Sequence, residues 1–378
     1  MIACIDASNI RHGGGVTHLI EVLRAARPEA AGFSKVIVWA GNTTLQRIED
    51  RPWLVKRHLP ILDRNVFFRA LWQRFSLTTL ARSVPCDVLY VPGGSYAGNF
   101  RPVVSMSQNL LPFEWTELAR YRWSWVGVKL RLLRATQTQT LQHADGVIFL
   151  TQYAQNVVSR SIGALSGKAV IIPHGIDNRF VSPPKAQLPI ERYSNDNPFR
   201  ILYVSIVDMY KHQWHVAEAV SQLRKSNIPV VLNLVGPAYP QALKLLNFAL
   251  NRLDPSGEFI RYIGAIPYSE LHTQYAEADL CVFASSCENM PNILLEGMAS
   301  GLPIACSRRG PMPEVLGHSG VYFEPESAAD IVRALRELID SPTLRARLAH
   351  GSFNRARNYS WTRCASETFN FLAQIAAS

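Results

Sequence analysis

The sequence is dominated by short apolar runs rich in Val and Ile, each followed by turn residues and then by a helix-like pattern. The first half contains IACIDA, KVIVWAG, DVLYVPGG, PVVSMSQN, GVIFLT and AVIIPHG, and the second half contains RILYVSIV, VVLNLVGP, FIRYIGAI, DLCVFASS and LPIACS. Runs of this length, bounded by turns, are typical of parallel strands buried on both faces. Their alternation with helices predicts βαβ units, and therefore an α/β chain with doubly wound sheets.

A polar segment rich in Pro and Asn, at residues 182–198, separates the two sets of runs, and such a composition is typical of a linker. We therefore expect two Rossmann-like domains, residues 1–182 and 198–360, facing each other across a cleft. Ligands of such sheets bind beyond the carboxyl ends of the strands. The amphipathic pattern at about 360–378 predicts a C-terminal helix.

The formal net charge of +10 suits anionic partners such as nucleotide phosphates, nucleic acid or an acidic membrane face. No recognised RNA- or DNA-binding module is present, so nucleic acid is not expected as a partner. The six cysteines form no C-x-x-C pair, which disfavours zinc sites and thioredoxin chemistry. No signal peptide and no run of about 18 apolar residues is evident, so we expect a cytoplasmic location without a membrane span.

Two segments of the first half, residues 64–82 and 113–134, mix Arg and Lys with Phe, Trp and Tyr. Such a mixture at helical spacing is typical of helices that lie in a membrane interface, with aromatic rings at headgroup depth and cations near anionic lipid. Ordinary surface helices whose aromatic residues enter the core are the alternative. We expect peripheral membrane association through these segments.

Three consecutive glycines, Gly13, Gly14 and Gly15, follow the first apolar run and precede a helical pattern. Glycine permits positive φ and close backbone approach, and the helix N-terminus that follows favours a phosphate. A glycine-rich turn without a ligand is the alternative, and the spacing does not match a dinucleotide-binding G-x-G-x-x-G. Lys211 lies between a predicted strand and a helix that begins near Gln213, and it is a candidate to bind a diphosphate. The alternative is a solvated surface lysine.

The stretch SCENMPNILLEG, residues 286–297, holds two carboxylates eight residues apart. Pro291 suits the first position of a helix, so Glu288 is expected in a loop and Glu296 in the second helical turn. A carboxylate accepts two hydrogen bonds from a vicinal diol, so Glu296 is a candidate for ribose and Glu288 for a second sugar. Free N–H groups near Asn292 and Ile293 would hold phosphates between them. The alternative is a loop cap at Glu288 and a solvated Glu296.

The second half as a whole resembles a known family. The pieces KHQ, YIGAIPYSELHTQYAEADLCVFASSCENMPNILLEGMASGLPIACSRRGPMPEVLGHSGVYFEP occur in the family's order within residues 201–330, and ADGVIFLT and IIPHGID near 144–177 resemble the end of its first domain. The chain thus resembles the retaining GT-B glycosyltransferases with the E-x7-E motif, also described as glycosyltransferase family 4-like or group 1.

This resemblance implies transfer of a sugar from a nucleoside diphosphate sugar, with retention of anomeric configuration and with no metal or other cofactor. It implies that Glu296 binds ribose, that Glu288 faces the donor sugar, and that Lys211 pairs with the diphosphate, which the glycine loop borders. It also implies that the C-terminal helix crosses back to the first domain. The implied donor-binding residues are Gly13, Gly14, Gly15, Lys211, Glu288, Asn289, Met290, Pro291, Asn292, Ile293 and Glu296.

The chain departs from the family's pattern at two positions. Ile206 stands where an Arg is common, so Lys211 would carry more of the phosphate charge, with help from Arg308 or Arg309. Gln108 stands where the first domain commonly places a catalytic-site His. Gln can hydrogen-bond a sugar hydroxyl but cannot carry a proton, which favours a mechanism in which the leaving phosphate accepts the acceptor's proton.

The resulting hypothesis is a hexosyltransferase with Glu288, Gln108 and Lys211 as catalytic residues. Mannose or a deoxymannose is the favoured sugar, and a GDP-sugar is slightly favoured over a UDP-sugar. The expected acceptor is a lipid-linked glycan or polysaccharide of a bacterial surface glycan (O-antigen, capsule or exopolysaccharide), at the inner face of the cytoplasmic membrane. The alternative is a catalytically inactive nucleotide-sugar-binding partner or scaffold, and a phosphorylase or epimerase is disfavoured.

Overall fold

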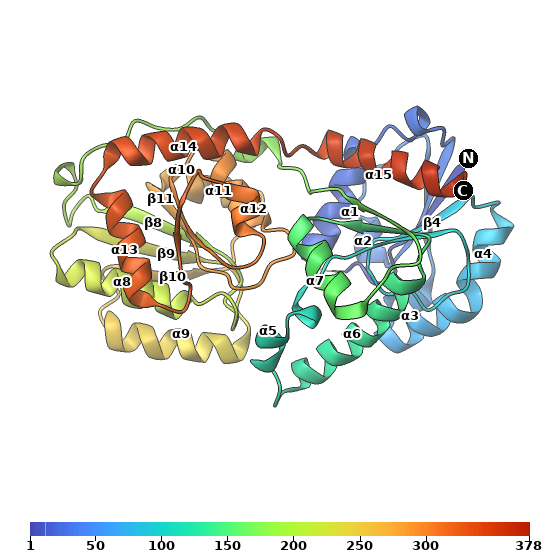
Figure 1. Ribbon diagram of the computed structural model, residues 1–378, viewed down its shortest axis with the longest axis horizontal. Coiled ribbons are helices and arrows are strands. Elements are labelled where there is room, and N and C mark those ends of the chain that lie inside the picture. Colours follow the sequence, from blue (N-terminus) through green and yellow to red (C-terminus); the bar gives the residue numbers. More distant parts are fainter. Residues whose placement is uncertain (12) are drawn as a thin grey trace. The chain divides into compact units, whose positions relative to one another are not determined.

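The computed structural model describes residues 1–11 and 13–378 of the chain. The chain divides into two compact units. The first unit comprises Met1–Gly175 and Tyr359–Ser378, and the second comprises Ile176–Asn358. Each is a parallel sheet with helices, as the alternating runs predict (Figure 1).

The boundary between the units differs from the expected one. The segment at 182–198 was expected to be a linker but belongs to the second unit, because its backbone is bonded there. Ser182 N donates to the carbonyl of Ala299 over 2.9 Å, and the buried Arg345 donates to the carbonyl of Leu188. A Pro- and Asn-rich composition shows that a segment is irregular but does not show that it is free of the domain.

The first unit holds a seven-stranded sheet in the order β3-β2-β1-β4-β5-β6-β7, and every neighbouring pair is parallel. Its strands are β1 (Ile2–Asp6), β2 (Lys35–Ala40), β3 (Leu54–His58), β4 (Val88–Val91), β5 (Val103–Met106), β6 (Gly146–Phe149) and β7 (Lys168–Ile171). Its helices are α1 (Gly14–Ala25), α2 (Asn42–Leu45), α3 (Val66–Trp72), α4 (Thr78–Ser83), α5 (Trp115–Ala119), α6 (Trp125–His143), α7 (Gln152–Ile162) and α15 (Trp361–Ala376). A π-helical turn, η3 (Gln73–Leu77), joins α3 to α4.

The second unit holds a six-stranded sheet in the order β10-β9-β8-β11-β12-β13, again with parallel pairs. Its strands are β8 (Phe199–Val204), β9 (Val230–Val235), β10 (Ile260–Gly264), β11 (Leu280–Phe283), β12 (Ile304–Ser307) and β13 (Val321–Phe323). Its helices are α8 (Gln213–Lys225), α9 (Pro240–Leu253), α10 (Leu271–Glu277), α11 (Asn292–Ala299), α12 (Met312–Leu316), α13 (Ala328–Ile339) and α14 (Pro342–Ala356). Helices lie on both faces of this sheet, which is why β11 and β12 are buried along their whole length (Figure 1).

The C-terminal helix α15 packs within the first unit, against α1 (Figure 1). The ring of Phe369 meets that of Phe33 edge to face with centroids 6.0 Å apart, and Trp361 lies 5.5 Å from His174 and 5.9 Å from His18. The helix therefore closes the first unit with residues from the far end of the chain.

Two strands were not expected from the sequence, and both lie at a sheet edge. The sequence of β3, LVKRH, contains three basic residues and therefore lacks the kind of apolar run that predicts the expected strands. β13 is only three residues long. Within the described residues, no helix is long and apolar enough to cross a membrane. No group of three or more His, Cys, Asp or Glu in the same residues is arranged to hold a metal ion.

Candidate functional site

The loops that follow β8 and β11 meet through an ion pair. Lys211 lies after β8, and its Nζ pairs with a carboxylate oxygen of Glu288, which lies after β11. Lys211 is 4% exposed, and its backbone carbonyl accepts a hydrogen bond of 2.6 Å from Tyr203 Oη. A buried ammonium is stable only with such a partner. Lys211 is therefore not a solvated surface lysine, and it lies beside the first carboxylate of the motif.

Backbone and side-chain contacts hold the same two loops together. Ser286 N donates to the carbonyl of Tyr210 over 2.8 Å, and a hydrogen bond of 2.9 Å joins His212 Nε2 and Ser286 Oγ. His212 adopts a φ of 53°, which is uncommon for a residue other than glycine. These contacts fix the position of the Lys211–Glu288 pair at the carboxyl ends of β8 and β11, where ligands of such sheets bind.

Glu288 and Glu296 lie on different kinds of structure, as expected. The helix α11 begins at Asn292, so Glu288 lies in the preceding loop and Glu296 in the helix. Pro291 is the N-cap of α11 instead of its first residue, which corrects the expected start by one position. Asn289, Met290 and Pro291 are buried, whereas Asn292 and Ile293 at the start of the helix are partly exposed.

Glu296 is buried at 7% exposure and accepts hydrogen bonds from two tyrosines. Tyr268 Oη lies 3.2 Å from Oε1, and Tyr275 Oη lies 3.1 Å from Oε2. Burial raises the pKa of Glu296 to about 7, against the lowering effect of the Tyr275 and Tyr268 hydrogen bonds. The alternative of a solvated helix residue is wrong. The sequence carries no signal for these tyrosines, because their approach depends on how α10 and the loop before it pack.

In the first unit, the structure brings Gln108 against the glycine loop. A Cβ atom at Gly15 would lie 2.6 Å from Gln108 Oε1, so a larger residue there would displace the Gln108 side chain from its present position. Gly13 has a φ of 69°, and both Gly13 and Gly14 are exposed at the start of α1. Gln108 Nε2 is buried and makes no hydrogen bond with the described residues. A buried donor without an acceptor beside an exposed helix N-terminus fits an anionic or hydroxyl-bearing ligand.

The cations expected to assist Lys211 are engaged elsewhere. Arg308 pairs with Asp330 at 2.6 Å, and Arg309 pairs with Glu324 at 2.5 Å. Ile206, at the position where the family has an Arg, is 37% exposed. The ion pairs of Arg308 and Arg309 do not support the expectation that these residues help Lys211.

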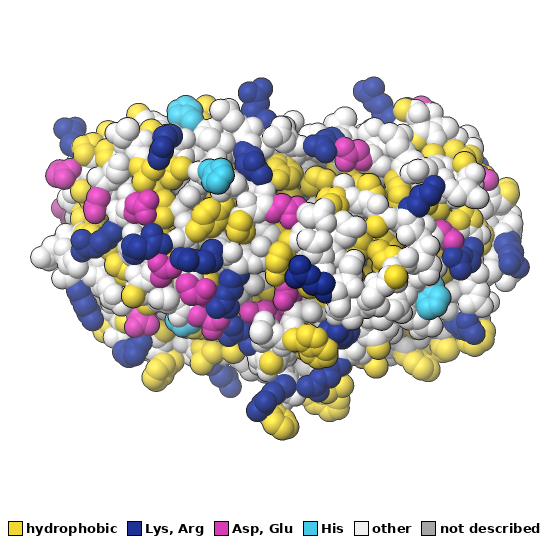
Figure 2. Space-filling view, viewed as in Figure 1, with side chains coloured by type: hydrophobic (Ala, Val, Ile, Leu, Met, Phe, Trp, Pro, Cys, Tyr) yellow, Lys and Arg dark blue, Asp and Glu magenta, His cyan; other side chains and the backbone are white. Residues whose placement is uncertain are grey.

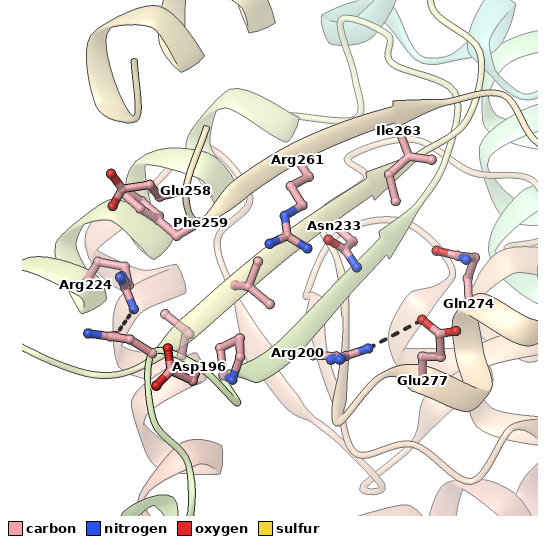
Figure 3. A pocket seen from close by; sticks show the side chains of 14 residues that line it. Asp196, Arg200, Arg224, Asn233, Glu258, Phe259, Arg261, Ile263, Gln274 and Glu277 are labelled. Atoms are coloured by element: carbon pink, nitrogen blue, oxygen red, sulfur yellow. Dashed lines mark hydrogen bonds and ion pairs between the residues drawn. The ribbon is translucent and has the colours of Figure 1, made fainter. Parts of the chain in front are cut away.

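A hollow of about 360 Å³ lies on another part of the second unit (Figure 3). Arg261 and Asn233 extend into it from β10 and β9, and Arg200, near the start of β8, pairs with Glu277 at 3.5 Å. None of the predicted site residues lines it. Since its residues gather near the amino ends of the strands, it is not where a doubly wound sheet binds its main ligand.

A family model described as "Glycosyl transferases group 1" matches residues 186–355, a range that contains Lys211, Glu288 and Glu296. Residues 186–355 are a group 1 glycosyltransferase domain. This domain takes up nearly all of the second unit, Ile176–Asn358.

Two curated relatives align with only part of the chain. Glycogen synthase of Mycobacterium tuberculosis is 24% identical over 258 residues, which is 67% of this chain and 60% of the relative. O-antigen chain mannosyltransferase B of Escherichia coli is 30% identical over 112 residues, which is 30% of this chain and 29% of the relative. The chain thus spans less than two thirds of the length of these relatives.

The similarity to solved structures extends over the whole chain. Sucrose-phosphate synthase from Thermosynechococcus elongatus has a TM-score of 0.77 and 18% identity, with 100% of this chain and 99% of that structure covered. At this identity the similarity concerns the fold alone. The group 1 domain and the first unit together have the GT-B fold, so the predicted fold class is confirmed.

Proposed function

We propose that the protein is a glycosyltransferase that uses a nucleoside diphosphate sugar. The observation that carries this proposal is the cluster of Lys211, Glu288 and Glu296 at the carboxyl ends of β8 and β11 in a group 1 domain. It offers a cation for phosphate on the loop after β8, and two carboxylates for hydroxyl groups on the loop and helix after β11. No single polar group in that cluster would serve both halves of such a donor.

Each residue of the cluster takes the role that its surroundings favour. Glu296, held by Tyr268 and Tyr275, accepts hydrogen bonds from the two ribose hydroxyls. Glu288 accepts bonds from the transferred sugar, assisted by backbone groups of Asn289 to Ile293. Lys211 exchanges part of its contact with Glu288 for the diphosphate, so donor binding also frees Glu288 to bind sugar.

The first unit has groups of its own that suit a phosphate or a sugar hydroxyl. The start of α1, where Gly13 and Gly14 are exposed and Gly15 is partly exposed, suits the diphosphate, and the unbonded Nε2 of Gln108 suits a sugar hydroxyl or phosphate oxygen. Gln108 does not move a proton. The leaving phosphate therefore accepts the acceptor's proton as the new glycosidic bond forms on the face that the phosphate leaves, which retains the anomeric configuration. Lys211 and the loop amides stabilise the negative charge on that phosphate without a metal ion.

The proposed acceptor is a lipid-linked glycan or polysaccharide in bacterial surface-glycan assembly, at the inner face of the cytoplasmic membrane. Exposed aromatic side chains in both basic segments support membrane association: Phe67 is 64% exposed, Phe75 73%, Trp123 88% and Trp125 81%. Figure 2 shows apolar side chains next to Lys and Arg side chains at the lower edge, below the α5 and α6 labels of Figure 1. The E. coli relative, named as an O-antigen chain mannosyltransferase, supports mannose as the transferred sugar. We propose GDP as the nucleotide that carries mannose or a deoxymannose.

The test begins with thermal shifts against GDP-, UDP-, ADP- and dTDP-sugars. A nucleotide at a hundredfold excess over its Kd stabilises its site by about 2.7 kcal/mol, so the donor is expected to stand out. Transfer from that donor to a lipid-linked acceptor is then followed by NMR, with retention of the anomeric configuration expected. Donor binding without transfer or hydrolysis would favour the inactive nucleotide-sugar-binding partner. Absence of binding by all four nucleotides would refute the proposal.

A further inference from the structure

The helical segment Val66–Leu77, formed by α3 and η3 and here called the clamp helix, exposes an apolar outer face. Val66 is 65% exposed, Phe67 64%, Leu71 36% and Phe75 73%. Apolar side chains gathered on one face of a helix are uncommon on a protein that meets only water, and mark a surface that another phase or molecule covers.

The charge around this face identifies what covers it. Residues 64–86 contain four arginines and no acidic residue. Arg64 and Arg74 are exposed among the aromatic residues, and the guanidinium of Arg64 lies 5.7 Å from the ring centroid of Phe68. Exposed rings interspersed with exposed arginines fit the headgroup layer of a bilayer that contains anionic phospholipids.

The inner face of the clamp helix carries the apolar Trp72 and Leu77 and also two buried polar side chains that contact the end of β1 and the loop after it. Gln73, 2% exposed, donates from Nε2 to Asp6 Oδ2 over 2.5 Å and accepts from Ala97 N over 3.2 Å. Arg69, 8% exposed, donates from Nε to Asn9 Oδ1 over 3.0 Å. Both long polar side chains are thus buried against the strand end and the loop that leaves it.

The gripped loop leads directly to the three glycines. Asp6 ends β1, and its Oδ1 accepts a hydrogen bond of 3.0 Å from Ser8 N. Arg11 reaches the other way, with Nη1 3.2 Å from the carbonyl of Asp63 and 3.1 Å from that of Arg64. The clamp helix therefore holds Asn9 and the end of β1, and the turn directly before the helix holds Arg11.

A π-helical turn lies where buried residues of this segment are followed by exposed ones. Trp72 and Gln73 are consecutive and both buried, whereas Arg74 and Phe75 directly after them are both exposed. A π-turn adds a residue to the helical repeat and shifts the side chains that follow it, and such turns occur often at functional sites. The turn begins at Gln73, the residue that binds Asp6.

We propose that the clamp helix couples membrane binding to the glycine loop. Its aromatic outer face binds an anionic bilayer, and the contacts of Arg69 and Gln73 then restrict the motion of residues 7–11. Membrane binding immobilises the clamp helix and therefore the loop that it contacts. Donor binding then has a smaller entropic cost, because the loop has already lost much of its motion. This inference rests on the proposed function for the membrane association and for the assignment of Gly13–Gly15 to the donor site.

The test measures hydrogen exchange of the full chain, with peptides that cover residues 2–20. Vesicles of equimolar phosphatidylglycerol and phosphatidylcholine are expected to bind the chain and slow exchange at residues 7–11 several-fold. Vesicles of phosphatidylcholine alone are expected to do neither. Binding to both vesicle types alike, or binding without a change in loop exchange, would overturn the proposal.

Variants separate membrane binding of the clamp helix from its effect on residues 7–11. Phe67→Ser with Phe75→Ser is expected to lose both vesicle binding and loop protection, whereas Phe248→Ser, at a 72% exposed aromatic residue on α9, keeps both. Gln73→Leu is expected to keep vesicle binding and lose loop protection. Asn9→Ala removes the acceptor of Arg69 from the loop side, and is expected to behave likewise even if Gln73→Leu fails to fold.

The outcomes distinguish this inference from the proposed function. Hydrogen exchange and sedimentation with vesicles require neither donor nor transfer. If the chain shows loop protection but transfers no sugar, the protection supports the clamp helix and the absence of transfer contradicts the proposed function. Full loop protection in both Gln73→Leu and Asn9→Ala would overturn the transmission. Unchanged vesicle binding in the Phe67→Ser, Phe75→Ser double variant would overturn the docking face.

Discussion

Glu288 and Glu296 belong to one twelve-residue stretch, yet the protein compensates their charges in different ways. Glu288 has a full counter-charge, the ammonium of Lys211. Glu296 has two neutral hydroxyl groups, from Tyr268 and Tyr275, and its pKa is raised by burial to about 7. The difference teaches that an ion pair binds a carboxylate in the ionised form, whereas neutral donors leave its ionisation open to the ligand and to pH.

The largest effect on stability is expected from Lys211→Met, because it leaves Glu288 without its counter-charge. Loss of one partner of a buried ion pair costs about 3 kcal/mol. Native-state hydrogen exchange of the β8 amides reports the free energy of unfolding of the second unit alone. The double variant Lys211→Met, Glu288→Gln is expected to recover part of the loss. Equal destabilisation in the single and double variants would show that the ion pair does not stabilise this loop.

Glu296→Ala is expected to weaken donor binding by at least about a hundredfold, since two hydrogen bonds to a charged group are lost at about 1.5–3 kcal/mol each. Titration calorimetry with the nucleotide sugar selected by the thermal-shift screen measures this loss. Glu270→Ala, at an exposed residue beside α10, serves as the matched control and is expected to bind normally. Near-normal affinity in Glu296→Ala would remove the ribose role from this residue.

The motif residues could be predicted from the sequence because their roles follow local order along the chain. Pro291 separates a loop from a helix, and this alone places Glu288 and Glu296 on different elements. The same local reasoning found eleven apolar runs that became strands but missed β3 and β13, whose edge positions remove the need for a long apolar run.

The partners of the motif residues could not be predicted, because they come from elements that only the fold brings near. Tyr275 lies on α10, and its approach to Glu296 depends on how α10 packs. Lys211 is buried although lysine is usually exposed, because Glu288 from another loop meets it. The grip of Gln73 on Asp6 across 67 residues of chain is of the same kind.

The pH dependence of donor binding sharpens the comparison further. A pKa of about 7 makes Glu296 mostly protonated at pH 6 and mostly ionised at pH 8. Since the ribose hydroxyls donate to the ionised form, donor affinity is expected to rise about tenfold across this interval. A nucleotide sugar is the appropriate ligand because its diphosphate does not titrate there. Glu296→Gln is expected to abolish the rise and Glu288→Gln to keep it; a rise that persists in Glu296→Gln would assign it to another group.

The smallest effects are expected at the two tyrosines, and they are expected to be unequal. Tyr275 is 1% exposed, so Tyr275→Phe leaves one oxygen of Glu296 without a donor and weakens donor binding by about tenfold. Tyr268 is 42% exposed, so in Tyr268→Phe water replaces the lost hydroxyl and the loss is about threefold. Both variants are expected to move the midpoint of the pH dependence upward, because each hydroxyl lowers the pKa of Glu296. Calorimetry between pH 6 and 9 measures affinity and midpoint together. An unchanged midpoint in Tyr275→Phe would mean that burial alone sets the ionisation of Glu296, and that its neutral partners only position it.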